Sequence, residues 1–411
     1  MKNFKVLSLA LAVASSLTTF GAVANETINM QAQIDDLQAL MAKKGNDVIF
    51  FGYARYGAQY QNGDTRYVNG IGSTGQTVGR LGNEANGGEF GIAKKYTAEN
   101  GAVWDLAVMV EHWSNDEWGD ESYGGVNLKR FYSGVTNIFE SQPGLYVWAG
   151  RDFHARLQQG LNDYYVTIED GQGGGFKDFD LGGAKLDFGF VGGVDDNEGS
   201  LGNDNGKYAA TSKIKGIDAG FAKIDAYAHF GFTSEDEGIE SAGLDSETAW
   251  LVGTQIKFDS ASLHVRYGDG ANNSVMGLKG DFQSVFVSYE GGFSASENWD
   301  INYLAAYYNQ SGDDATDQNE YSLIVRPQYR WNDIHSTWIE TGYALVDEDS
   351  GNETDGWKVT LSQNMSIGGL PGSRPMLRFY ATVGEKDVAP QGSANTTTDT
   401  VSFGAMFEAW W

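Results

Sequence analysis

The chain has 411 residues, a net charge of −27 and no cysteine. An acidic chain of this kind repels the phosphate backbone, so no nucleic-acid partner is expected. The lack of cysteine excludes disulfide bonds, so stability must come from hydrogen bonding and a large fold. Glycine (55 residues) and aromatic residues (13%) are abundant and proline (5 residues) is scarce. This composition favours long hydrogen-bonded strands, because proline removes ladder hydrogen bonds.

Residues 1–24 have the pattern of a secretory signal peptide. Lys2 and Lys5 precede an apolar run at 6–13, and Ala22-Val23-Ala24 provides small residues for cleavage. The run is too short to cross a bilayer as a helix, which needs about 20 apolar residues. A buried core helix is the alternative interpretation. The pattern predicts export and a mature chain that begins near Asn25.

Residues 25–47 contain the clearest helical pattern in the chain. Met30, Ile34, Leu37 and Met41 are spaced alternately by four and three residues, as in the apolar seam of a coiled coil. The segment is short, so it needs tertiary or oligomeric support. We expect either a small homotrimeric coiled coil on the periplasmic side or an amphipathic helix lying on its own domain.

Residues 48–411 alternate with period two and read as one all-β domain. In the first strand Tyr53 and Arg55 share one face, while Phe50 and Tyr56 share the other. Clusters of Gly, Asn and Asp separate many such runs and favour turns. The pattern predicts a transmembrane antiparallel β-barrel, in which closure removes the sheet edges. Similar runs occur at 103–112, 128–138, 145–153, 182–194, 221–230, 249–258, 262–268, 282–290, 299–308, 321–330, 336–346, 357–367 and 375–383.

The last strand shows the alternation most clearly. Phe403, Phe407 and Trp411 lie on one face, and Glu408 and Trp410 lie on the other. One face suits lipid and the other suits water. A terminal aromatic residue of this kind resembles the C-terminal signature of bacterial outer-membrane barrels. We therefore expect an outer-membrane location, with outer-membrane lipids and the barrel-assembly machinery as partners.

The sequence gives little support for an enzyme or a metal site. The five histidines show no His-x-x-x-His or Cys-His spacing, and no Gly-x-Ser-x-Gly motif is present. We therefore expect neither catalysis, nor a metal, nor a cofactor. A purely structural or adhesive barrel is a further alternative. The histidines are His112, His154, His229, His264 and His335.

A series of motifs in a shared order resembles the maltoporin family of carbohydrate-selective porins. The resemblance covers nearly all of 48–411, and the N-terminal coiled-coil pattern is more similar to that of sucrose-type porins. It implies a barrel of roughly 18 strands, a homotrimer and an inward-folded third loop. The motifs are FFGYARYG (50–57), GRLGNE (79–84), VWAGRDF (147–153), LNDYYVTIEDGQGGG (161–175), NWDINYLAAYY (298–308), RPQYRW (326–331), STWIETGYALV (336–346), SRPMLRFYATV (373–383) and FGAMFEAWW (403–411).

The same resemblance implies passive diffusion of maltodextrins or related oligosaccharides along a luminal aromatic track. A general ion-permeable porin without a sugar site is the alternative. The residues that match the family's track aromatics are Tyr53, Trp118 and Trp410. Those that match its constriction are Tyr165, Arg156 and Asp163, and Arg80 and Glu89 match its charged channel lining. Strand alternation places Arg55 on the same luminal face as Tyr53, so it is a further channel-lining candidate.

Three positions depart from the family's aromatic track. Glycine (Gly87 or Gly88) stands where the family has a tyrosine, Leu370-Pro371-Gly372 stands where a tryptophan is expected, and Val252 replaces a phenylalanine. Trp250 shares a face with Val252, so it is a candidate substitute. These departures favour a wider or differently shaped track, suited to another saccharide.

Overall fold

The computed structural model describes residues 48–113, 125–194, 204–234, 243, 247–368 and 374–411. The expected signal peptide (1–24) and coiled-coil segment (25–47) lie outside these residues. Within the described ranges, no helix has the length and apolar character needed to cross a membrane.

The described residues form one 18-stranded antiparallel sheet that closes on itself. The closing pair is β1 with β20, in which Tyr53 lies opposite Trp410. The predicted antiparallel barrel of about eighteen strands is therefore confirmed. The strands are β1 (Val48–Gln61), β2 (Gly87–Thr97), β3 (Val103–Trp113), β4 (Asn127–Thr136), β5 (Tyr146–Asp152), β8 (Gly171–Asp180), β9 (Lys185–Val194), β10 (Asp204–Asp218), β11 (Lys223–Thr233), β12 (Ala249–Lys257), β13 (Ala261–Asp269), β14 (Gln283–Ser296), β15 (Trp299–Ser311), β16 (Gln318–Arg330), β17 (His335–Glu348), β18 (Glu353–Ser366), β19 (Met376–Ala389) and β20 (Thr396–Trp410).

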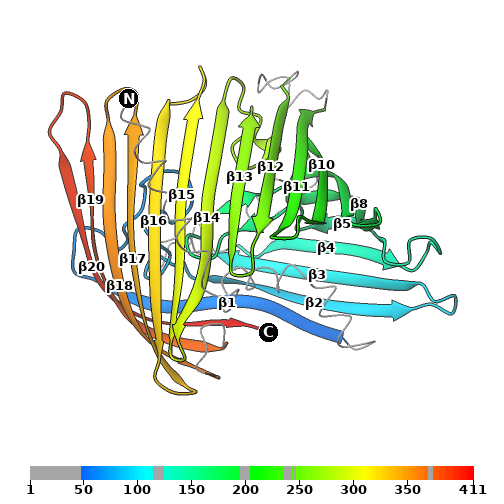
Figure 1. Ribbon diagram of the computed structural model, residues 1–411, viewed down its shortest axis with the longest axis horizontal. Helices are drawn as coiled ribbons and strands as arrows, with labels where there is room; N and C mark the ends of the chain where they lie inside the picture. The colour runs from blue at the N-terminus through cyan, green and yellow to red at the C-terminus, as the bar shows by residue number, and fades with distance from the viewer. Residues whose placement is uncertain (1–47, 114–124, 195–203, 235–242, 244–246, 369–373) are drawn as a thin grey trace.

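The strands follow chain order around the barrel. Figure 1 shows β14 to β19 standing side by side, with β1 to β4 crossing the lower part of the view. Three of the strands, β2, β8 and β10, were not among the runs expected from the sequence. Strand β8 contains Gly173, Gly174 and Gly175, which supply no side chains to alternate.

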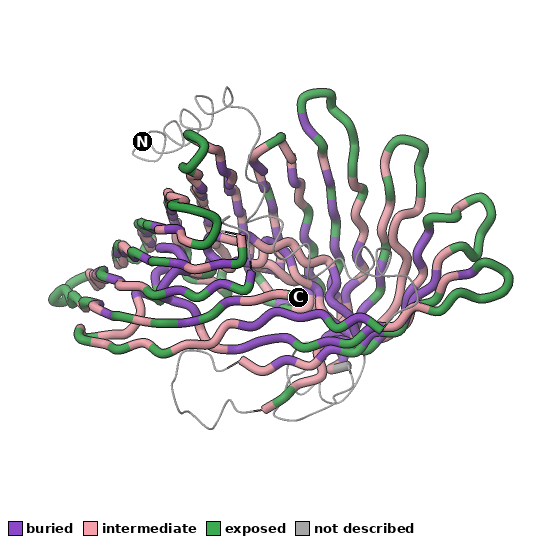
Figure 2. The backbone as a smooth tube through the Cα atoms, turned by 90° about the horizontal axis from the view of Figure 1, so that it is seen from below, coloured by how far each residue is buried: buried purple, intermediate pink, exposed green. Residues whose placement is uncertain are grey.

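Burial alternates along the strands, as Figure 2 shows by colour. On β20, Phe403 is 54% exposed on the outer surface, whereas Ser402 and Glu408 are fully buried on the luminal side. On β17, Tyr343 is exposed and Glu340 is buried. The outer face is apolar and the inner face is polar, which is the arrangement of a barrel that meets lipid outside and water inside.

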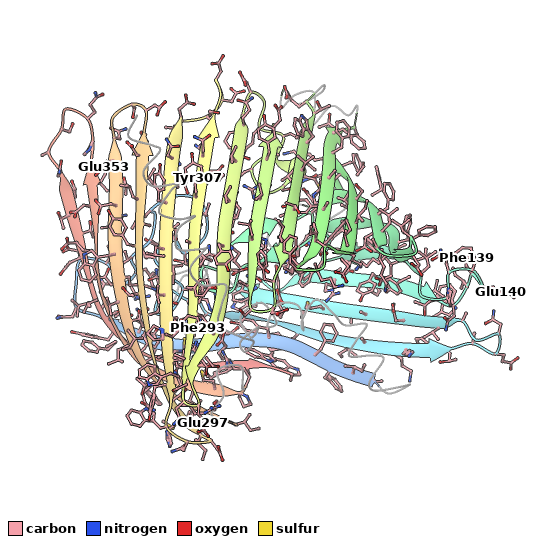
Figure 3. All side chains as sticks on the ribbon, viewed as in Figure 1. Phe139, Glu140, Phe293, Glu297, Tyr307 and Glu353 are labelled. Carbon is pink, nitrogen blue, oxygen red and sulfur yellow. The ribbon has the colours of Figure 1, made fainter. Side chains whose placement is uncertain are left out.

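The two ends of the barrel differ in the length of their connections. Short turns such as the one at Glu297 lie at one end, and Glu353 lies at the other (Figure 3). Short turns are typical of the periplasmic end and longer loops of the extracellular end. Three of the longer connections bear on the site: 62–86, 153–170 and 270–282.

These three loops make their contacts inside the barrel. Loop 153–170 contains the small hairpin β6 (Leu157–Gln158) and β7 (Tyr165–Thr167), and loop 270–282 contains the 3-10 turn η2 (Val275–Gly277). Val166 and Val275 are fully buried against luminal side chains. The core of the molecule is therefore the loop-filled interior of the barrel.

Candidate functional site

The seam between β1 and β20 carries the first group of luminal side chains. The Tyr53 hydroxyl donates a hydrogen bond to Oε1 of Glu408 at 2.8 Å. Trp410 lies opposite Tyr53 in the strand register and is half-buried. The guanidinium of Arg374 lies 4.2 Å from the centre of the Trp410 ring. The barrel therefore closes at a site where the Trp410 ring has the Arg374 cation at its face.

Glu408 is the centre of a buried charge network. Its carboxylate accepts hydrogen bonds from Arg80 at 3.0 Å, from Arg374 at 2.7 Å and from Arg378 at 3.0 Å. Its side chain is fully buried. A buried carboxylate is tolerable only when paired and hydrogen-bonded, and three guanidinium groups meet that requirement.

Loop 62–86 brings Arg80 and Glu84 into this network. Burial disfavours the charge on Arg80, but Glu408 and Asp163 raise the pKa of its guanidinium well above the usual value. Burial likewise acts to raise the pKa of Glu84, but Arg378 and Arg80 outweigh it, so the pKa of this carboxyl lies below its usual value. Both groups are therefore charged at neutral pH, and they fix the loop to the wall.

The same loop is held to β17 and β18 farther along. Oε1 of Glu340 accepts a hydrogen bond from the backbone N–H of Leu81 at 2.8 Å, and Oε2 accepts one from Arg326 at 2.9 Å. The Lys358 ammonium donates to the carbonyl oxygens of Gly79 and Leu81, both at 2.5 Å. Loop 62–86 thus covers the luminal wall on this side.

The third loop, 153–170, brings Asp163 to the opposite side of the network. Its carboxylate lies 3.0 Å from Arg55 and 3.7 Å from Arg80. Asp163 has a positive φ of 54°, a conformation that L-residues rarely adopt outside tight turns. The loop therefore joins β1 to loop 62–86 through one acidic residue.

Arg156 and Tyr165 lie together farther along the third loop. The Arg156 guanidinium forms an ion pair with Asp170 and lies 5.1 Å from the centre of the Tyr165 ring. The neighbouring Tyr164 packs on Phe286 of β14, with ring centres 5.1 Å apart. The loop is thus anchored to the far wall, and the Arg156–Tyr165 pair repeats the combination of a ring and a cation.

Glu89 lies on the luminal face of β2. It pairs in register with Tyr53 on one side and with Glu111 on the other. Lys129 lies 3.0 Å from Glu111.

Nine of the ten expected site residues lie in the described part of the chain, and eight of these are luminal or on the third or first loop.

The ninth, Trp250, corrects the sequence interpretation. It is 41% exposed on the outer face of β12 and contacts Tyr267, with ring centres 5.1 Å apart. Val252 faces outward with it, whereas Leu251 between them is fully buried. Trp250 therefore cannot substitute for a luminal aromatic residue. Trp118, the tenth, lies outside the described residues, as does 370–372.

Several luminal residues of the site are not among those expected from the sequence. Glu408 is the centre of the charge network, Arg374 and Arg378 contact it, and Trp113 stacks on Tyr53 with ring centres 6.2 Å apart. Parity on the last strand was a usable signal, since Glu408 shares the polar face with Trp410. The strand expected at 103–112 ends one residue before Trp113, the last residue of β3.

The site combines aromatic faces with ionic groups at their edges. Aromatic faces pack against apolar C–H surfaces, and charged groups form strong hydrogen bonds with hydroxyl groups. The arrangement can bind a molecule that has an apolar face bordered by hydroxyls.

Comparisons with known proteins agree with this geometry. The family model described as LamB porin matches residues 48–411. A maltoporin of Hahella chejuensis is 26% identical over 431 residues, covering 99% of this chain and 98% of the relative, and one of Vibrio cholerae is 26% identical over 419 residues, covering 89% and 95%.

Among solved structures, OpdO of Pseudomonas aeruginosa shares the fold. Its TM-score is 0.50 at 10% identity, with 89% of this chain and 97% of that chain covered. At that identity the likeness concerns the fold alone. The family match, by contrast, extends over the whole described barrel. The chain belongs to the LamB porin family and is a β-barrel porin of the bacterial outer membrane.

Proposed function

We propose that this porin gives sugar-selective, passive diffusion of maltodextrins or related oligosaccharides along luminal aromatic residues. One observation supports it above the others: Tyr53 and Trp410 lie opposite one another on the luminal face, with Glu408 and Arg374 in contact with them. The names of the two maltoporin relatives point to the same substrate class.

The physical basis is the shape of a pyranose ring. One face presents C–H groups that pack on an aromatic ring, and the hydroxyls at the edge bond to charged side chains. Tyr165 with Arg156 offers a second contact of the same kind at the third loop. Several weak contacts of similar strength bind a sugar without trapping it, so it can pass through.

We also propose that the protein assembles as a homotrimer. The exposed outer face of the barrel is apolar over many strands, so it can pack against a second copy as well as against lipid. In this assembly Trp118 would serve as a track aromatic contributed to a neighbouring channel. The mass of the protein in detergent tests the assembly, and a mass of one or two chains would contradict it.

A general ion-permeable pore is the second candidate. The outward orientation of Trp250 and Val252 favours it, because β12 then contributes Leu251 rather than an aromatic ring to the lumen. Sugar selectivity and general permeation give different results with a graded panel of sugars.

The deciding experiment reconstitutes the wild-type protein in liposomes and measures swelling with glucose, sucrose and maltooligosaccharides of increasing length. If the channel is sugar-selective, maltooligosaccharides should give higher swelling rates than their molecular size alone would allow, with sucrose as the reference. Swelling rates that fall smoothly with molecular size alone would support the general pore and contradict the proposal.

A further inference from the structure

Three neighbouring strands place Arg55, Gly87 and Trp113 in one row. Arg55 of β1 lies opposite Gly87 of β2, and Gly87 lies opposite Trp113 of β3. Trp113 continues the luminal parity of β3, on which Met109 and Glu111 are buried and Trp104 and Leu106 are exposed outside. The central residue of the row has no side chain.

The missing side chain at Gly87 makes room for the indole of Trp113. A Cβ atom at Gly87 would lie 2.4 Å from Cε3 and 2.6 Å from Cδ2 of that indole. These distances are far below van der Waals contact, so the ring lies directly over the Gly87 backbone. Trp113 therefore leans across β2 toward β1 and occupies the surface that a side chain at position 87 would cover.

The indole ends among the residues of the proposed sugar site. Its ring stacks on Tyr53 with centres 6.2 Å apart and planes inclined by 27°. The Arg55 guanidinium lies 5.3 Å from the centre of the Trp113 ring. Arg55 is itself held by Asp163 at 3.0 Å and by the carbonyl oxygen of Ala85 at 2.9 Å.

Trp113 differs from the buried aromatic residues of the interior. It is half-buried, whereas Trp338 is only 2% exposed beneath three arginines. Trp113 thus keeps part of its surface free for a ligand. The side chains of Arg55 and Asp163, next to this site, are 11% and 25% exposed, so both can reach the hydroxyl groups of a ligand.

We propose that Trp113 is a specificity-determining, sugar-contacting residue, and that Trp113 and Trp410, which lie on either side of the buried Tyr53 ring, form the main sugar-binding surface of this channel. The proposal rests on the sugar-selective function proposed above. A pyranose would pack its C–H face on the free part of the indole and direct its hydroxyls to Arg55 and Asp163. Gly87 and Trp113 then act as a pair: the glycine on β2 makes possible the ring from β3.

The test measures current block by maltohexaose in planar bilayers. We expect Trp113→Ala to raise the half-blocking concentration about tenfold, the effect of losing one aromatic contact. Trp113→Phe should retain most of the block. The matched control is Trp104→Ala, because Trp104 is on the same strand but 47% exposed on the outer face, and it should behave as wild type.

Two further variants test the pairing with Gly87 and cover the case in which Trp113→Ala fails to assemble. Gly87→Ala leaves the tryptophan in place but displaces its ring, so block should weaken. Gly87→Tyr combined with Trp113→Ala should restore much of the block, since a ring from β2 would fill the same space.

The outcomes separate this inference from the function on which it rests. If both Trp113→Ala and Gly87→Ala were blocked by maltohexaose as strongly as the wild type, the role of Trp113 would be overturned, but the proposed sugar selectivity would stand. No block of the wild-type channel by any maltooligosaccharide would overturn both. Equal weakening by Trp104→Ala would show that the effect is structural and would also overturn the proposal.

Discussion

Two parts of the lumen use charged and aromatic residues in opposite ways. On the wall covered by loop 62–86, Glu340, Lys358 and Arg378 are fully buried and paired. The second part is the corner where Tyr53 of β1, Trp113 of β3 and Trp410 of β20 meet, called here the open corner. Its two tryptophans, Trp113 and Trp410, are only half-buried. The covered wall is built for rigidity, and the open corner keeps ring faces available. A luminal position alone therefore does not make a residue part of a sugar track.

The largest effect is expected at Glu408, which joins the two regions. Glu408→Gln removes the charge that pairs with Arg80, Arg374 and Arg378. Leaving buried charges without a partner costs about 3–5 kcal/mol, so the free energy of unfolding should fall by roughly that amount. Urea unfolding in detergent measures it, with the exposed Glu353→Gln as the control (Figure 3). A loss below about 1 kcal/mol would contradict a structural role for the network.

The next effect concerns how loop 62–86 is held. Glu340→Gln weakens the contacts with Leu81, Arg326 and Lys358. The loop should detach part of the time, so single-channel ion conductance should rise and become noisier. Bilayer recordings in the absence of sugar measure this. Conductance equal to that of wild type, at equal stability, would mean that other contacts are enough to hold the loop.

A smaller effect, dependent on pH, is expected in the third loop. Burial, together with Lys177 and His229, lowers the pKa of His154 to about 3, against an ordinary value of about 6.5. Between these two values the unfolded chain binds a proton that the folded chain does not. Stability should therefore fall as the pH drops below about 6.5, by at most about 1.4 kcal/mol per pH unit.

His154→Asn removes this titration, so the free energy of unfolding should depend less steeply on pH between 6.5 and 5. Urea unfolding at several pH values measures the slope. His335→Asn, at a half-buried position near a short turn, is the matched control. Identical slopes for His154→Asn and wild type would show that His154 does not titrate on unfolding.

The sequence predicted the barrel well because alternation on most strands separates polar from apolar faces. It failed on β12, where Ala249 and Leu251 on one face and Trp250 and Val252 on the other are all apolar. No polarity marks the lumen there, so Trp250 was assigned to the wrong side. The contact of Arg80 with Glu408 joins residues 328 positions apart, and no local pattern encodes it. The position of Trp113 over Gly87 depends on strand register, which is likewise invisible in sequence.

The most direct test of the sugar-binding corner compares two tryptophans. Trp410 lies at the corner, and Trp357 of β18 is 42% exposed on the outer face. Current block by a graded series of maltooligosaccharides should weaken about tenfold in Trp410→Ala and remain unchanged in Trp357→Ala. Wild-type affinity in Trp410→Ala, or equal losses in both variants, would contradict sugar binding along the luminal aromatic residues.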